Sequence, residues 1–141
     1  MLEAQENKES FLKDIAKKNK NVEYIITLVS SKDQEEVLFR QEEAASHVIR
    51  LKEKKHPHTL MYSKTVDTLL KENNFPYPQF LKVDVQCHEL EVLKGAEKTL
   101  EHTEICLLEV SLMDKGYNSP LLLDVEILWI QKTSTLMTSH S

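Results

Sequence analysis

Glycine is almost absent from this sequence. Gly95 and Gly116 are the two glycines among 141 residues, and no GxG motif occurs. Glycine-rich cofactor cradles expose backbone N–H groups at positions where a Cβ would obstruct the ligand. The shortage of glycine therefore argues against an enzyme that holds a nucleotide through a phosphate-binding glycine loop.

Long apolar runs and dense positive charge are also lacking. No apolar stretch approaches the roughly 20 residues that span a bilayer, and the acidic N-terminal segment lacks the apolar region of a signal peptide. The net charge is −5, and the one dense basic stretch, Lys52–Lys55, includes Glu53. This balance disfavours a nucleic acid or an anionic membrane as partner. We expect a protein with no membrane span and no nucleic-acid partner.

Cysteine is scarce, and the histidines show no metal-binding pattern. Cys87 and Cys106 form no disulfide framework, which fits a reducing compartment and predicts a cytoplasmic location. His47, His56 and His58 lie near one another in the chain. No Cys or acid completes a recognisable ligand spacing around them, so the sequence indicates exposed loop histidines and no metal site.

The first half of the chain alternates between helical and extended patterns. Apolar residues at helical spacing predict a helix over Asn7–Lys20. The β-branched segment Val22–Val29 predicts a strand buried on both faces. Residues 30–34 have turn chemistry, and Val37–Phe39 predicts a short antiparallel strand. Between Gln41 and Met61 the pattern is weaker, and we expect a surface excursion with some helix.

The second half has stronger patterns. Thr65 is expected to cap a helix that continues to Leu70, and the prolines and asparagines of 73–78 must end it. A strand is predicted over Phe80–Val85, a helix over His88–Leu100 and a further strand over Ile105–Val110. Strand, helix and strand in this order predict a βαβ unit with parallel strands and a right-handed crossover, which places the chain in the α/β class.

The end of the chain carries one more helical pattern. Ser119 and Pro120 are expected to begin a helix that continues to Trp129. Residues 131–141 are rich in Ser and Thr, and we expect them to form a disordered tail. The predicted domain therefore covers residues 1–130.

Four ordered motifs resemble one known family. The segment Phe80–Ala96, FLKVDVQCHELEVLKGA, is similar to the signature LKIDVEGxExxVLKGA. Ile105–Val110, ICLLEV, resembles the following strand, and Thr65–Leu70, TVDTLL, resembles the preceding TLDxLL helix. Leu2–Ala4 is similar to the end of the second strand, FEP or FEA. In this order and spacing, from about residue 2 to residue 125, the motifs resemble the FkbM family of S-adenosylmethionine-dependent O-methyltransferases.

The resemblance implies a fold and a cofactor. It implies a Rossmann-like class I methyltransferase fold, with a mostly parallel sheet, flanking helices and S-adenosylmethionine bound at the carboxyl ends of the strands. An acid that closes the second strand binds the ribose hydroxyls in such enzymes, and Glu3 is the matching residue. Taken without the other motifs, Glu3 is a carboxylate near the chain terminus.

Two further acids are candidate catalytic residues by the same resemblance. Asp84 matches the carboxyl end of the fourth strand, beside the methyl-transfer site, where a carboxylate can orient or deprotonate an acceptor hydroxyl. Asp84 can equally serve as a cap of the helix that follows. Glu109, near the end of an apolar strand, is expected to be buried and to need a partner. Glu89 fits the first turn of a helix better than a catalytic role.

Three departures from the family pattern set further expectations. The opening strand and its glycine-rich loop, which would precede Glu3, are lacking, and so is the final hairpin. Cys87 replaces the signature glycine, which costs on the order of 1 kcal/mol if the backbone there needs a positive φ. We therefore expect weak cofactor binding and self-association through exposed strand edges.

Two functions remain open at the level of the sequence. The first is a fragment of an O-methyltransferase that transfers a methyl group, without a metal, to a hydroxyl of a small molecule or a sugar. The alternative is a truncated, inactive methyltransferase-like chain that serves at most as an interaction module. A strand and glycine loop encoded before Met1 would favour the first.

Overall fold

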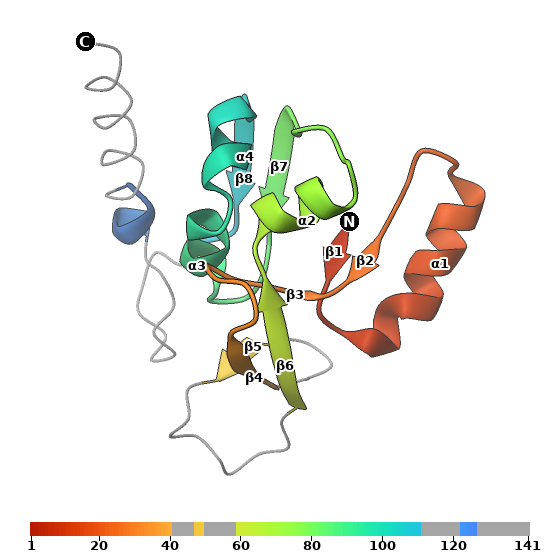
Figure 1. Ribbon diagram of the computed structural model, residues 1–141, viewed down its shortest axis with the longest axis horizontal. Helices are drawn as coiled ribbons and strands as arrows, with labels where there is room; N and C mark the ends of the chain where they lie inside the picture. Colours follow the sequence, from red (N-terminus) through yellow and green to blue (C-terminus); the bar gives the residue numbers. More distant parts are fainter. Residues whose placement is uncertain (41–46, 50–58, 111–121, 127–141) are drawn as a thin grey trace.

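The computed structural model describes residues 1–40, 47–49, 59–110 and 122–126, and of 47–49 only the backbone. The described part is a mixed α/β structure (Figure 1). Its strands are β1 (Leu2–Glu3), β2 (Ile25–Ile26), β3 (Leu28–Val29), β4 (Glu36–Arg40), β5 (His47–Ile49), β6 (Thr59–Lys64), β7 (Phe80–Val83) and β8 (Ile105–Leu108). Its helices are the 3₁₀ turn η1 (Glu6–Lys8), α1 (Glu9–Lys18), α2 (Val66–Glu72), α3 (Glu89–Lys94) and α4 (Glu97–His102).

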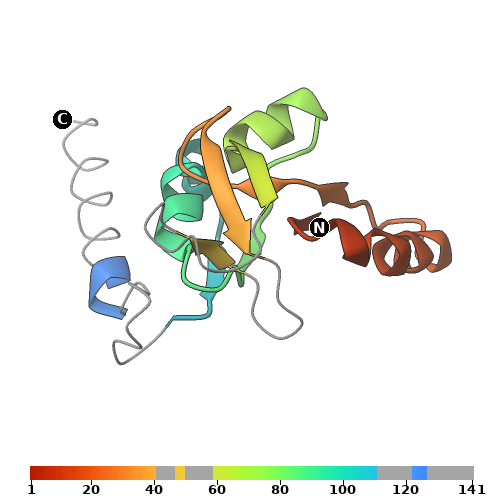
Figure 2. The same cartoon turned by 90° about the horizontal axis from the view of Figure 1, so that it is seen from below.

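The strands form three small sheets within the described residues. β1 pairs with β2, β7 pairs with β8, and the third sheet has the order β3-β6-β4-β5. The first two sheets are parallel, and so is the β3–β6 pair. α1 and the β1–β2 pair lie to one side of the molecule, while β7, β8, α3 and α4 lie together on the other (Figures 1 and 2). The expected α/β class is confirmed, with parallel pairs in place of one continuous sheet.

The βαβ unit of the second half is confirmed. β7 and β8 run parallel, with Phe80 opposite Ile105 and Val83 opposite Leu108. Residues alternate between the two faces of a strand, so Leu81 and Val83 face the helices and join the main hydrophobic core. On the opposite face Phe80 and Ile105 are exposed, and no described element covers them.

The single helix predicted over His88–Leu100 is wrong, because the chain forms α3 and α4 with a break at Gly95 and Ala96. Asp67 of α2 holds the start of α4: its carboxylate accepts hydrogen bonds from Lys98 N at 2.9 Å, Thr99 N at 2.9 Å and Thr99 Oγ1 at 2.7 Å. A carboxylate that satisfies the free N–H groups of a helix start acts as a cap. Here the cap comes from a different helix, so the local sequence pattern could not reveal the break.

The strand predicted over Val22–Val29 is divided between two sheets. Ile25 pairs with Leu2 of β1, whereas Leu28 pairs with Ser63 of β6. Between the two short strands, Thr27 N donates to Glu3 O at 2.8 Å. The segment is extended as expected, but it changes neighbours halfway and is only partly buried over β2.

The described parts of the segment Gln41–Met61 are extended, and the rest of it, where some helix was expected, lies outside the described residues. Residues 47–49 form β5, and Thr59–Met61 form the first half of β6. Both pair with the antiparallel strand β4, which contains the predicted strand Val37–Phe39. β4 therefore has a partner on each side.

The predicted cap of the helix after residue 64 is confirmed. Thr65 Oγ1 accepts a hydrogen bond from Thr68 N at 3.1 Å. Asp33 adds two hydrogen bonds, from Thr65 N and from Thr68 Oγ1, both at 2.7 Å. At the N-terminus, α1 confirms the first predicted helix, with Leu12 buried and Phe11 64% exposed.

The end of the chain is described only in part. Residues 122–126 are helical, which agrees with the helix predicted from Ser119 to Trp129, while both ends of that prediction lie outside the described residues. The tail expected at 131–141 also lies outside them. Among the residues described here, no helix is long and apolar enough to cross a membrane.

Candidate active site at the carboxyl ends of β7 and β8

Asp84 follows β7 directly and is exposed to solvent. Its Oδ2 lies 2.9 Å from the Nζ atom of Lys82. The two residues are two positions apart, so both side chains extend from the same face of the strand. The helix α3 begins instead at its N-cap His88. Asp84 is therefore not the cap of that helix, and the capping interpretation of this residue is wrong.

Glu109 occupies the equivalent position after β8. Its backbone N donates to Val83 O at 3.2 Å, which continues the pairing of the two strands, and its carboxyl group lies beside that of Asp84. The structure thus brings Asp84 and Glu109 together at the ends of adjacent parallel strands. Glu109 is exposed, so the expectation of a buried carboxylate is wrong. The strand ends two residues earlier than predicted, and Glu109 extends beyond the core.

Lys82 sets the charge state of Asp84. Its hydrogen bond to Asp84 lowers the pKa of that carboxyl. Burial opposes this effect, and the charge of Lys82 and the neighbouring side chains of Glu109 and Gln86 lower the pKa further. The pKa of Lys82 is in turn raised, first by its hydrogen bond to Asp84 and then by the two acidic charges. At neutral pH the site therefore holds an ionised Asp84 beside a protonated Lys82.

Glu89 stabilises the loop between Asp84 and α3. It lies in the first turn of α3 and is only 3% exposed. Its Oε1 accepts a hydrogen bond from Cys87 N at 3.2 Å. Burial raises the pKa of Glu89, and backbone hydrogen bonds from the loop oppose that rise. Glu89 therefore has the structural role expected from the sequence.

The same loop contains two residues in the left-handed region. Gln86 has φ 51° and Cys87 has φ 70°. The backbone at Cys87, where the family signature has glycine, thus adopts the positive φ under which the sequence expected a cost. The Cβ atom at this position costs on the order of 1 kcal/mol, and the interactions of Glu89 hold the loop in place.

His88 connects this loop to the end of β3. Its Nε2 lies 3.1 Å from Oγ of the buried Ser30. Burial lowers the pKa of His88 below its ordinary value, the negative charges of Glu91 and Glu35 oppose this, and Lys94 lowers it further. The imidazole is therefore held neutral between two parts of the chain that are distant in sequence.

Acidification is expected to destabilise the fold through His88. The imidazole of His88 binds a proton less readily in the folded chain than in the unfolded chain. The contribution of His88 to the free energy of unfolding is therefore fully present above about pH 6.5 and is lost as the pH falls below that value. Because one proton is involved, the free energy of unfolding should change by at most about 1.4 kcal/mol per pH unit. Urea unfolding at about pH 8 and about pH 5.5 measures this loss. His88→Gln should flatten the slope, whereas His102→Gln, at an exposed residue, should not. Equal slopes for the two variants would contradict the assignment.

Glu3 ends β1, away from the acidic pair. Its Oε1 accepts a hydrogen bond from Gln5 N at 2.8 Å, so the carboxylate turns toward its own loop. Its backbone O accepts from Thr27 N, which ties β1 to the β2 segment. Glu3 thus lies at the carboxyl end of a parallel strand, as Asp84 and Glu109 do, but on a separate sheet.

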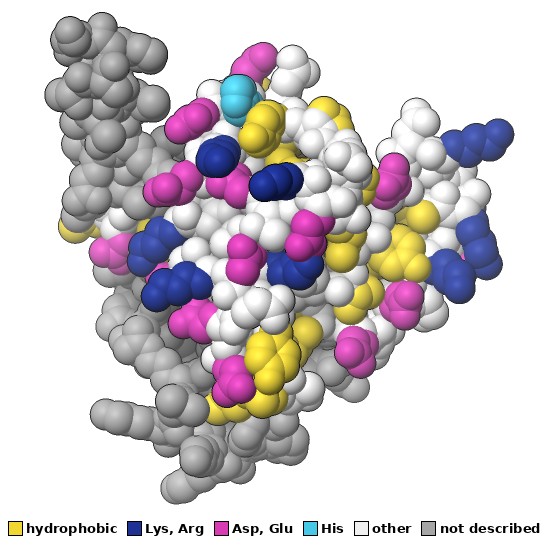
Figure 3. All heavy atoms as spheres, in the orientation of Figure 1, with side chains coloured by type: hydrophobic (Ala, Val, Ile, Leu, Met, Phe, Trp, Pro, Cys, Tyr) yellow, Lys and Arg dark blue, Asp and Glu magenta, His cyan; other side chains and the backbone are white. Residues whose placement is uncertain are grey.

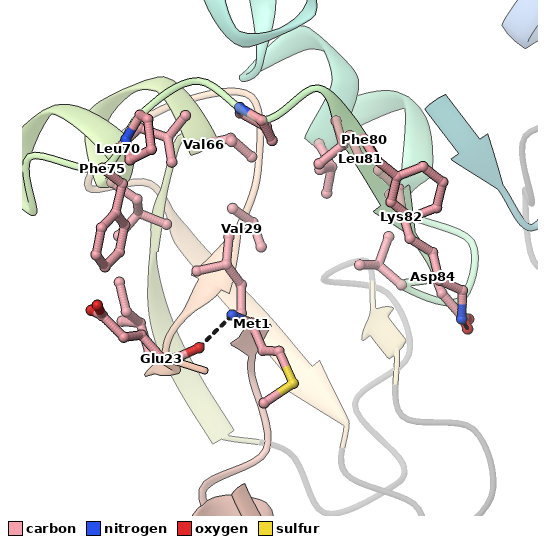
Figure 4. A pocket seen from close by; sticks show the side chains of 18 of the residues that line it. Met1, Glu23, Val29, Val66, Leu70, Phe75, Phe80, Leu81, Lys82 and Asp84 are labelled. Atoms are coloured by element: carbon pink, nitrogen blue, oxygen red, sulfur yellow. Dashed lines mark hydrogen bonds and ion pairs between the residues drawn. The ribbon is translucent and has the colours of Figure 1, made fainter. Parts of the chain in front are cut away.

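An apolar groove separates these two sheets. It has a volume of about 770 Å³ and is lined by β1 and β2 on one side and by β7 on the other, with Val66 and Val92 among its remaining walls. Figure 4 shows Met1 and Val29 across the opening from Leu81. Lys82 and Asp84 also belong to the lining, so the acidic pair adjoins the groove. We call this feature the β1–β7 groove.

S-adenosylmethionine presents a sulfonium cation, a ribose diol and a carboxylate to a protein. Asp84 and Glu109 suit the cation, and Glu3 suits the diol. A carboxylate is commonly held by the N–H groups of a glycine loop. Gly95 is the one glycine in the described part of the chain, and the backbone of Ser30 fills the space beside its Cα. The described residues therefore fit two parts of this cofactor and not the third.

Sequence reasoning found the two acids of the site and missed Lys82. The sequence did contain a signal for Lys82, since a lysine two positions before an acid on a strand lies on the same face as that acid. Nowhere in the described ranges do three or more His, Cys, Asp or Glu side chains form a group that could hold a metal ion.

Parallel strands joined by helices, with acids directly after the strands, define an α/β protein of the kind that binds ligands at the carboxyl ends of its strands. A family model described as the methyltransferase FkbM domain matches residues 2–128. The chain belongs to the FkbM methyltransferase family. Comparisons with curated proteins and with solved structures gave no match.

Proposed function

We propose that this chain acts in S-adenosylmethionine-dependent O-methylation. Membership of the FkbM methyltransferase family supports methyl transfer in general. The observation that carries the proposal further is the pair of Asp84 and Glu109, whose carboxyl groups lie beside each other at the ends of adjacent parallel strands. In the proposed arrangement the parallel pairs are parts of a Rossmann-like sheet, and the acceptor is a hydroxyl of a small molecule or a sugar.

Asp84 orients the acceptor hydroxyl in this mechanism. Lys82 keeps the pKa of Asp84 low, so the carboxylate is ionised and is a weak general base near neutral pH. It would accept a hydrogen bond from the hydroxyl, aim the oxygen lone pair and take the hydroxyl proton once the new O–C bond makes that proton strongly acidic. Glu109 adds negative charge at the same place. The bound cofactor supplies an electrophilic methyl group.

Glu3 is the proposed ribose ligand. Its carboxylate would exchange the hydrogen bond from Gln5 N for hydrogen bonds donated by the two ribose hydroxyls. Because the described residues provide no glycine loop for the carboxylate of the cofactor, this chain should bind the cofactor weakly. We expect a dissociation constant roughly in the micromolar range or weaker.

Radiolabelled methyl transfer tests the proposal. The chain is incubated with methyl-labelled S-adenosylmethionine, at a concentration that saturates the weak site, and with a set of alcohols and sugars. Label in an acceptor, and inhibition by S-adenosylhomocysteine, are the expected results. Isothermal titration gives the cofactor affinity, which Glu3→Gln should lower while Glu6→Gln, at an exposed neighbour, should not. An absence of both saturable binding and label transfer would refute the proposal.

A further inference from the structure

The loop between β7 and α3 contains a turn whose backbone conformation costs free energy. Gln86 and Cys87, at φ 51° and 70°, follow one another in the left-handed region, which residues with a Cβ seldom adopt. Such strain persists only where the surroundings over-determine the backbone, and it concentrates at functional sites. Asp84 of the candidate site lies two residues before Gln86, so the strained turn adjoins the proposed chemistry.

The turn is anchored on both sides. The carboxylate of Glu89, which is only 3% exposed, accepts a hydrogen bond from Cys87 N at 3.2 Å. On the other side, His88 Nε2 lies 3.1 Å from Oγ of the buried Ser30. These contacts hold the backbone in its strained conformation and leave the side chain of Gln86 with a fixed starting direction.

The turn brings the side chain of Gln86 back beside Asp84. The pKa of Asp84 is lowered first by Lys82 and, further, by the neighbouring side chain of Gln86. An amide stabilises a carboxylate in this way by donating an N–H to it. Gln86 is half-buried, whereas Asp84 is exposed. Asp84 therefore has one neighbour on the strand before it and another on the turn after it.

Lys82 alone would hold the orientation of Asp84 weakly. Figure 4 shows the two side chains extending beside each other from β7, and they are 55% and 35% exposed. Exposed ion pairs contribute little, and a lysine is a point charge on a flexible stem. On the face shown in Figure 3, acidic and basic side chains are interspersed without a block of one sign. The planar amide on the anchored turn is thus the more rigid neighbour of Asp84.

We propose that Gln86 is a positioning residue, which aims the carboxylate of Asp84 at the acceptor hydroxyl. The proposal rests on the function proposed above for Asp84, and Gln86 acts through that residue without touching the acceptor. Lys82 and Gln86 together fix the plane of the carboxylate and leave its remaining lone pairs for the hydroxyl. The family signature has glutamate in place of Gln86, and an ionised glutamate donates no hydrogen bond. The contact is therefore a feature of this chain.

Gln86→Gly separates positioning from a purely structural role. Glycine adopts a positive φ without strain but lacks the amide, so the variant should resist urea at least as well as the wild type. Its kcat for methyl transfer should nevertheless fall about tenfold, with little change in KM, because Asp84 loses its orientation. Gln34→Gly is the matched control, since Gln34 also has a positive φ, 58°, and is exposed outside the site. It should be equally stable and fully active.

Carbon-13 NMR of the side-chain carboxyl of Asp84 gives a second readout, without cofactor or acceptor. Asp84→Asn assigns the resonance. The pKa of Asp84 should be higher in Gln86→Gly than in the wild type, because the amide donor is lost. In Gln86→Glu it should be higher again, because two carboxylates repel each other. Gln34→Gly should leave the titration of Asp84 unchanged.

Three results would overturn the proposal. They are an unchanged titration of Asp84 in Gln86→Gly, a wild-type kcat in that variant, and a lower resistance to urea, which would give the side chain a structural role. The titration needs no methyl transfer. If no form of the chain transfers methyl groups, the proposed function fails, while the titration still decides whether Gln86 holds Asp84.

Discussion

Gly95→Ala is expected to lower the free energy of unfolding by about 3 kcal/mol, the upper range for overpacking in a tight site. Gly95 ends α3 with φ −81°, a conformation that alanine adopts freely. By that criterion alone, alanine would stabilise the fold by about 0.4–1 kcal/mol. The surroundings reverse the sign, because a methyl group would overlap the carbonyl oxygen of Ser30 and press against Ser31 Cα. These are backbone atoms and cannot rotate away.

Urea unfolding monitored by circular dichroism measures this effect. Glu101→Ala, at an exposed residue of α4, is the control and should change stability by less than about 0.5 kcal/mol. The steric overlap in Gly95→Ala should also weaken the hydrogen bond from Asp67 N to Gly95 O, which is 3.2 Å long in the structure. An equal or higher midpoint for Gly95→Ala would show that the segment at Ser30 can move aside.

Asp84→Asn is expected to reduce methyl transfer by about 10²-fold, the scale for loss of a catalytic acid–base group. Asparagine has nearly the same shape and keeps an oxygen that can accept from Lys82, so the change removes mainly the negative charge. The loss should be in kcat, because the residue acts on the acceptor hydroxyl in the proposed mechanism. Affinity for the cofactor should fall much less than kcat, since Glu3 keeps the ribose contact and Glu109 remains near the sulfonium.

The effect of Asp84→Asn is separable from a loss of stability. The ion pair of Asp84 with Lys82 is exposed, and exposed pairs contribute at most about 1 kcal/mol, so the variant should fold. Asp14→Asn, which alters a similar exposed acid on α1, is the control and should retain full activity. Methyl transfer at the wild-type rate by Asp84→Asn would end the catalytic proposal for this residue.

Local patterns predicted the elements whose signals lie within a few residues. The alternation at Phe80–Val83 and the cap at Thr65 are of this kind, and the structure confirms both. The division of the helix at Gly95 and the change of partner at Thr27 depend on contacts with distant residues. Such contacts leave no periodicity in the sequence, so the predictions there were wrong.

The candidate site was also predictable only in part. The sequence predicted Asp84 and Glu109 as separate candidates near the ends of two parallel strands, and the structure places them side by side. The exposure of Glu109 was not predictable, because it depends on where β8 ends. The effect of Lys82 on Asp84 needed the side-chain geometry.

The contact of Gly95 with Ser30 also constrains the order in which the chain folds. Ser30 and Ser31 meet α3 and its preceding loop across about 60 residues of sequence, as the hydrogen bonds of Ser30 with His88 and of Ser31 with Glu91 show. Contacts between distant residues require loop closure before they return any free energy, and they slow folding. The βαβ unit of β7, α3, α4 and β8 needs much shorter loops. We expect this unit to form early and to provide the surface on which the segment at Ser30 docks in the final, rate-limiting step.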